Sequence, residues 1–88
     1  MASRFAYRVG EHMIRVGQLY RDADTTTIRT LRVDHLDVQR HSDRRWYCHV
    51  GCTVIRHQQG EKVTEPMEPV SVPAARLAGD AYLLLSEY

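Results

Sequence analysis

The stretch RWYCHVGCTVIRH, residues 45–57, decides the fold class, because it is the longest run in the chain that alternates as a β-strand does. β-Branched and aromatic residues dominate it, as is usual in strands. Its C-terminal half is partly apolar on both faces, and Gly51 can bend a strand of this length between two halves of a curled sheet. We expect one face to point into the core, with Trp46, Cys48, Val50, Cys52 and Val54.

Shorter runs of the same kind lie on both sides of this stretch. Gly and Pro mark the breaks between them, and Pro73 followed by two alanines favours a single helical turn before the last run. The acidic segment 61–68 forms either a short strand at 62–64 or a long exposed loop. We expect the other strands at residues 14–20, 28–38, 69–72 and 81–85.

The side-chain pattern within these strands makes further predictions. Val33 and Leu36 have opposite parity, and a strand cannot move its apolar set to the other face without an extra residue. We therefore expect a β-bulge near Asp34 and His35. Gly17 suits a sharp bend in the first strand. In the last strand we expect Leu83 and Leu85 to face inward.

Several short strands separated by turns predict a small all-β domain. The helical turn before the last strand is typical of the SH3-like layout in particular, so we expect a mainly antiparallel, five-stranded SH3-like barrel. A chain of 88 residues has room for one core. We assign residues 12–88 to the barrel and residues 1–11 to an N-terminal arm or an extra strand.

Composition narrows the class of protein. The chain has 12 Lys and Arg against 11 Asp and Glu, so it lacks the basic excess of a strong nucleic-acid binder. It has no apolar run long enough to span a membrane, and its N-terminus lacks the apolar core of a signal peptide. Its two cysteines fit a reducing compartment. We expect a cytoplasmic protein that does not contact membranes.

Two short motifs resemble a known group of sequences. VGQLYRDAD at residues 16–24 and RTLRV at residues 29–33, with Arg76-Leu77 and the final YLL, are similar to small uncharacterised proteins of actinobacteria and their phages. The fourth strand departs from that pattern, because it carries no basic residue. The resemblance implies a barrel fold and a phage context, and it brings no established activity.

Candidate reactive residues are few. Cys48 and Cys52 share one face of an extended strand roughly 13 Å apart, too far for a disulfide or a shared zinc ion unless the strand folds sharply at Gly51. We therefore expect two buried free thiols. His35 near Asp37, and His41 near Asp43, could each orient an imidazole, but no nucleophile motif accompanies them. We expect no catalytic residues, no metal and no cofactor, and thus no enzyme.

Three polar segments could bind a partner. The hairpin at residues 40–47 combines arginines with Trp46 and Tyr47; it is either a solvated turn whose Trp plugs the barrel, or a surface that holds a single nucleic-acid strand. Asp22 and Asp24 lie in a turn that flanks the peptide-binding groove of SH3-like folds, and their charge suits a basic partner. The acidic segment 61–68 would suit a basic protein surface.

The function that these features favour is a non-enzymatic interaction module for a protein partner, such as a phage-derived accessory protein or inhibitor. Tyr, Trp and Arg are the residues that anchor interfaces. The alternative is a nucleic-acid-binding barrel in which Arg29 and Arg32 extend the arginine face. We expect a monomer or a homodimer formed through its strands. The predicted partner-binding residues are Arg40, Arg44, Arg45, Tyr47, Asp22, Asp24 and Tyr20.

Overall fold

The computed structural model describes residues 2–24, 26–40 and 45–86. Most of the described residues lie in β-strands, and the only helix among them is a single turn. The elements are β1 (Ala2–Arg4), β2 (Ala6–Val9), β3 (His12–Arg15), β4 (Leu19–Asp22), β5 (Thr27–Arg40), β6 (Trp46–Gln59), β7 (Lys62–Thr64), β8 (Glu68–Pro73), α1 (Ala74–Leu77) and β9 (Tyr82–Ser86).

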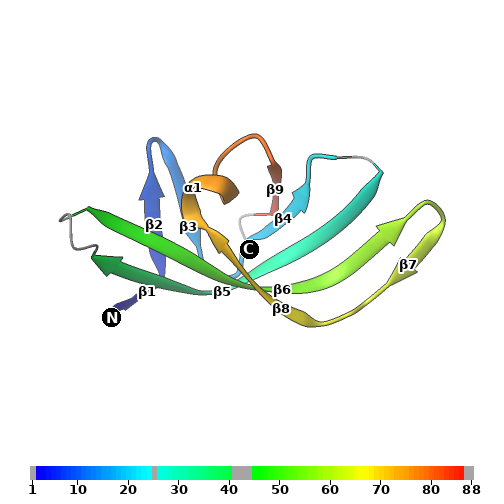
Figure 1. The fold of residues 1–88 in the computed structure, drawn as a ribbon, viewed down its shortest axis with the longest axis horizontal. Helices are drawn as coiled ribbons and strands as arrows, with labels where there is room; N and C mark the ends of the chain where they lie inside the picture. The colour runs from blue at the N-terminus through cyan, green and yellow to red at the C-terminus, as the bar shows by residue number, and fades with distance from the viewer. Residues whose placement is uncertain (1, 25, 41–44, 87–88) are drawn as a thin grey trace.

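Two long antiparallel strands, β5 and β6, run the length of the molecule (Figure 1). Most of the other strands pair with one of these two. β4 pairs with β5 and β9 pairs with β4, while β7 and β8 pair with successive parts of β6. The sheet curls into a half-barrel, and α1 lies directly before the last strand. The predicted mainly antiparallel, all-β, SH3-like barrel with a short helical turn before the last strand is confirmed, but the described residues form nine strands rather than five.

The bulge in β5 lies where the sequence predicts it. The register with β6 shifts between Val33 and His35, so both Val33 and Leu36 point inward and are buried. A second shift follows at Thr30 and Leu31. The bulge thus places apolar residues of both parities on the same face of this 14-residue strand.

The core lies between the concave face of the sheet and the elements that cover it. Cys48, Val50, Cys52 and Val54 of β6 are buried, as predicted, and Val72 of β8 packs beside them. The cover includes the β2–β3 hairpin and α1, whose buried residues are Ala74 and Leu77. The other members of the core are Ile14, Tyr20, Leu31, Val33, Leu36, Val38 and Tyr82.

Three side chains expected in the core lie outside it. Trp46 is 57% exposed, because Cys48 and Val38 form the last buried pair before the hairpin and Trp46 pairs beyond it with Arg40. Leu83 and Leu85 are 44% and 50% exposed. In the register with β4, Leu83 lies opposite Arg21 on the outer face, and Tyr82 faces inward instead.

The N-terminal region forms three short strands, β1, β2 and β3. The strand expected at 14–20 is divided into β3 and β4, because the chain turns at Gly17, where φ is +97°; the sharp bend expected at Gly17 is confirmed. The Gly17 N–H donates to the Val33 carbonyl at 2.8 Å, which ties this turn to β5. β1 pairs with β5, and β2 pairs with β3 as a hairpin across Gly10.

The acidic segment after β6 forms a short strand rather than a long exposed loop, the first of the two predicted alternatives. A short strand, β7, pairs with the end of β6. β8 then begins at Glu68, and Val70 and Val72 face the core as expected. No helix in the described ranges is long and apolar enough to cross a membrane.

Candidate functional site

The predicted partner-binding residues fall into two groups that lie far apart. Arg40 and Trp46 pair at the hairpin end of β5 and β6, whereas Asp22 contacts Arg29 near the other end of β5. Ten strand residues separate Arg29 from Arg40, which corresponds to at most roughly 36 Å along the strand. Figure 1 shows these two ends on opposite sides of the molecule. Arg44 lies outside the described residues.

A pocket of about 230 Å³ opens beside the exposed indole of Trp46. Its walls come from β2, the start of β6 and the junction of β8 with α1, and they include Tyr7, Arg8, Tyr47 and Pro73. We call this the Trp46 pocket. Three aromatic residues therefore line this pocket, which lies beyond the last buried pair of β5 and β6.

The charge around the Trp46 pocket is positive. The guanidinium carbon of Arg40 lies 5.6 Å from the centre of the Trp46 ring, a cation–π geometry. Arg8 lines the pocket, and its described lining contains no Asp or Glu. Arg45 directly precedes Trp46 and is exposed. Arg40, Arg45 and Tyr47 thus all lie at the hairpin end of β5 and β6, and their role in binding stays a prediction.

Tyr47 is held in place by its neighbours. Its hydroxyl donates to Gln39 Oε1 at 2.5 Å, and its ring meets the His49 imidazole edge-on with centroids 5.3 Å apart. Both contacts run across or along the outer face of β5 and β6. An aromatic ring fixed in this way loses little rotational freedom on binding, which favours recognition.

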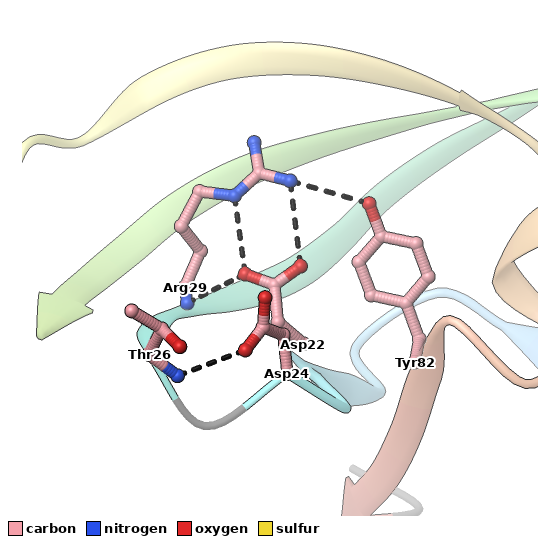
Figure 2. Close-up of polar contacts among 5 residues, drawn as sticks. All are labelled: Asp22, Asp24, Thr26, Arg29 and Tyr82. Atoms are coloured by element: carbon pink, nitrogen blue, oxygen red, sulfur yellow. Dashed lines mark hydrogen bonds and ion pairs between the residues drawn. The ribbon is translucent and has the colours of Figure 1, made fainter.

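Asp22 and Asp24 have structural partners of their own (Figure 2). Asp22 Oδ2 accepts hydrogen bonds from the Arg29 backbone N–H at 2.8 Å and from Nε at 3.2 Å. The same guanidinium donates to the Tyr82 hydroxyl at 3.3 Å, and its bond to Asp22 raises the pKa of Arg29. Asp24 accepts from the Thr26 N–H at 2.9 Å, which closes the turn.

Tyr20 is not available to a partner, and its predicted role in binding is wrong. Only 1% of it is exposed. Its hydroxyl donates to Gln18 Oε1 at 2.8 Å and lies 2.7 Å from His12 Nε2. Gln18 is itself fully buried and also bonds the backbone of Arg15 and Met13, so this polar group fixes the turn between β3 and β4.

The wider arginine face expected for nucleic-acid binding is divided by ion pairs. Arg29 is paired with Asp22, and Arg32 Nε donates to Asp34 at 2.8 Å. Burial alone would raise the pKa of Asp34, but hydrogen bonds from Thr53 and Arg32 outweigh it and lower that pKa below its ordinary value. Both arginines therefore lie in neutralised pairs away from the Trp46 pocket.

A second hollow lies on the outer face of the sheet. It measures about 340 Å³, and the residues that line it include His35, Asp37, His49 and Ser71. Asp37 Oδ1 is buried without a hydrogen-bond partner among the described residues, and Oδ2 accepts from Gln39 at 3.3 Å. His35 and Asp37 therefore share a hollow, yet no bond joins them in the described structure. His41 and Asp43 lie outside it.

The two cysteines are buried free thiols, as expected. Both lie on the inner face of the extended β6. Burial, with a smaller contribution from the charge of Asp34, raises the pKa of Cys52 to about 12. Within the described ranges, no three His, Cys, Asp or Glu side chains gather as a metal site requires.

Sequence reasoning misses the other walls of the Trp46 pocket. Tyr7, Arg8 and Pro73 are far from Trp46 in the chain and carry no local motif. They reach it because β2 folds over the concave face and β8 ends beside the start of β6. Only the tertiary fold brings these segments to one place.

Comparisons with protein-family models, with curated proteins and with solved structures found no match. The resemblance to actinobacterial and phage proteins therefore stays a prediction.

Proposed function

We propose that this chain is a non-enzymatic interaction module that binds a protein partner at the Trp46 pocket. The observation that carries the proposal is the exposed Trp46 ring beside a pocket lined by Tyr7 and Tyr47. Trp, Tyr and Arg are the residue types that dominate binding energy in interfaces. Here all three types converge at one end of a rigid barrel.

The free energy gained when a partner covers the Trp46 side chain is large enough for an anchor contact. A Trp side chain presents up to about 250 Å², so covering the 57% that is exposed is worth roughly 2–4 kcal/mol. The pocket beside it accepts a side chain from the partner. Binding therefore removes apolar surface on both sides, which is how hot spots form.

The arginines define the chemistry of the partner. Arg8 lines the mainly apolar Trp46 pocket, Arg40 lies over the Trp46 ring, and the exposed Arg45 directly precedes Trp46. A segment that inserts an aromatic or large aliphatic side chain and carries Asp or Glu on either side matches both features. Arginine forks bind carboxylates well, because they can donate two parallel hydrogen bonds.

The test uses Trp46 as its own reporter, since it is the only Trp in the chain. A random peptide library is selected on the immobilised protein, and the enriched peptides are titrated while Trp46 emission is recorded. We expect an apolar residue flanked by carboxylates in the enriched set, and a spectral shift on binding. Trp46→Ala should weaken binding at least about tenfold, measured by anisotropy of the labelled peptide.

The matched control is Val63→Ala, which removes an exposed apolar side chain from β7, away from the pocket. It should leave peptide affinity unchanged. Selected peptides that bind Trp46→Ala and the unmodified chain equally well would count against the proposal.

A single nucleic-acid strand is the second candidate, favoured by the Arg40 guanidinium stacked over the exposed Trp46 ring. Bases stack on such rings, and arginines pair with phosphates. The same fluorescence titration with an oligothymidine decides between the two. Binding by the oligonucleotide alone, weakening steeply with salt, would favour this candidate.

A further inference from the structure

The strands that border the curled sheet differ in how they avoid pairing with other chains. β7 carries Lys62 and is flanked by Glu61 and Glu65, and β8 contains Pro69 and Pro73. Charges and prolines are the usual means of blunting an exposed edge. β9 has neither within the strand: residues 81–86 contain no charge and no Pro, and the nearest charged residues in the sequence are Asp80 and Glu87 outside it.

The backbone of β9 is presented for pairing. The Ala23 N–H donates to the Ala81 carbonyl at 2.9 Å, and β4 pairs with β9 in antiparallel register from there. Backbone groups alternate in direction along such a ladder, so Leu83 faces β4 while the N–H and C=O of Tyr82 and Leu84 point away from it. β9 is the terminal strand of this side of the sheet in the described residues.

The side chains of β9 add an apolar surface to this open edge. Leu83, Leu84 and Leu85 are 44%, 37% and 50% exposed. Three neighbouring leucines left this open on an edge strand are unusual, since such edges recruit other strands. The outer edge of β9 therefore has backbone N–H and C=O groups that point away from β4, exposed apolar side chains, and no charged side chain.

We propose that β9 pairs antiparallel with β9 of a second copy of this chain, about a two-fold axis at Leu84. In this register the two Leu84 residues exchange backbone hydrogen bonds across the axis. Leu83 of each copy then lies opposite Leu85 of the other, so the most exposed leucines cover one another.

A second copy fits this edge because β9 is self-complementary. An uncharged strand meets no like charge when it pairs with itself, and a two-fold axis uses the same surface twice. A ribbon this short buries less than the roughly 800 Å² per partner of a standard interface, so the dimer should dissociate on dilution. β9 lies near the middle of the molecule, away from the start of β6 (Figure 1).

Sedimentation of the purified chain across a dilution series, from about 5 to 500 μM, tests the proposal. The average mass should rise from 10.2 kDa toward twice that value. Leu83→Lys with Leu85→Lys should keep the mass at the monomer value throughout, with an unchanged circular dichroism spectrum because both residues are exposed. Val63→Lys on the β7 edge is the matched control and should dimerise as the unmodified chain does.

Cross-linking tests the register. Residues that exchange hydrogen bonds in an antiparallel pair have Cα atoms about 5.5 Å apart, which a disulfide can bridge. Leu84→Cys should therefore form a covalent dimer on mild oxidation, while Val63→Cys should not. A constant monomer mass over the whole series, or a dimer that persists with lysines at positions 83 and 85, would overturn the proposal.

Discussion

Gly51 lies directly beneath the imidazole of His35. A Cβ atom at this position would come within 2.0 Å of His35 Cε1, far inside contact distance. Glycine lowers stability in the middle of a strand. We infer that Gly occupies position 51 because the His35 ring leaves no space for a larger side chain. The sequence suggests a bend at Gly51, but the register places His35 opposite it at the bulge.

Substitution of Gly51 by Ala should force the His35 ring out of its place. We expect Gly51→Ala to destabilise the protein by about 1–2 kcal/mol, the usual cost of overpacking. With His35→Ala in the same chain the clash disappears, and Ala should then stabilise the strand by about 0.5 kcal/mol. Urea unfolding of both single variants and the double variant measures the coupling; a Gly51→Ala variant as stable as the unmodified chain would contradict this contact.

At the scale of strands, Asp34 fastens the bulge of β5 to β6. It accepts hydrogen bonds from Arg32 beside it and from the Thr53 hydroxyl across the ladder. These bonds lower the pKa of Asp34 although burial opposes them. A bulge leaves the ladder irregular, and this carboxylate supplies a side-chain tie at that point.

Thr53→Val should remove this tie in a pH-dependent way. The pKa of Asp34 is lower in the folded than in the unfolded chain, so the stability it contributes is present above its ordinary value of 3.8 and is lost as pH falls through the folded value. We expect a loss of about 1–2 kcal/mol near neutral pH. The difference should shrink in acid below about pH 3.8, measured by urea unfolding across pH; a constant difference would contradict the assignment.

At the scale of the whole molecule, one charged cluster connects three strands. Arg29 of β5 binds Asp22 of β4 and Tyr82 of β9 (Figure 2). β9 follows β4 in the chain by some sixty residues, so this contact helps to close the curled sheet. Asp24 lies close by, is exposed, and accepts a hydrogen bond from the Thr26 backbone N–H.

Asp22→Ala should therefore cost far more than Asp24→Ala. The first removes the acceptor for an Arg29 backbone N–H and for its guanidinium, and we expect a loss of about 2–3 kcal/mol. The second should cost about 0.5 kcal/mol, as is usual for an exposed site. Thermal unfolding compares the two, and neither should change peptide affinity at the Trp46 pocket. Equal losses would show that the cluster does not connect the strands.

Local patterns were sufficient to predict several of the strands and much of the core. Alternation predicted β5, β6 and β8, and the parity change in β5 required the bulge, because side chains of a strand can only point to two faces. The same rule failed for Trp46, since alternation reports a face and not where the core ends along the strand. For β9 both faces are apolar, and the register with β4 selected Tyr82 as the inward residue.

The sequence by itself determined an all-β barrel, its bulge and the turn before the last strand, because these follow from contacts between near neighbours and from the two-residue period. The tertiary structure decided which residues share a surface. It separated Asp22 from Arg40, buried Tyr20 and brought Tyr7, Arg8 and Pro73 to Trp46. Those outcomes depend on register and curl between strands far apart in the chain, and no local pattern contains that information.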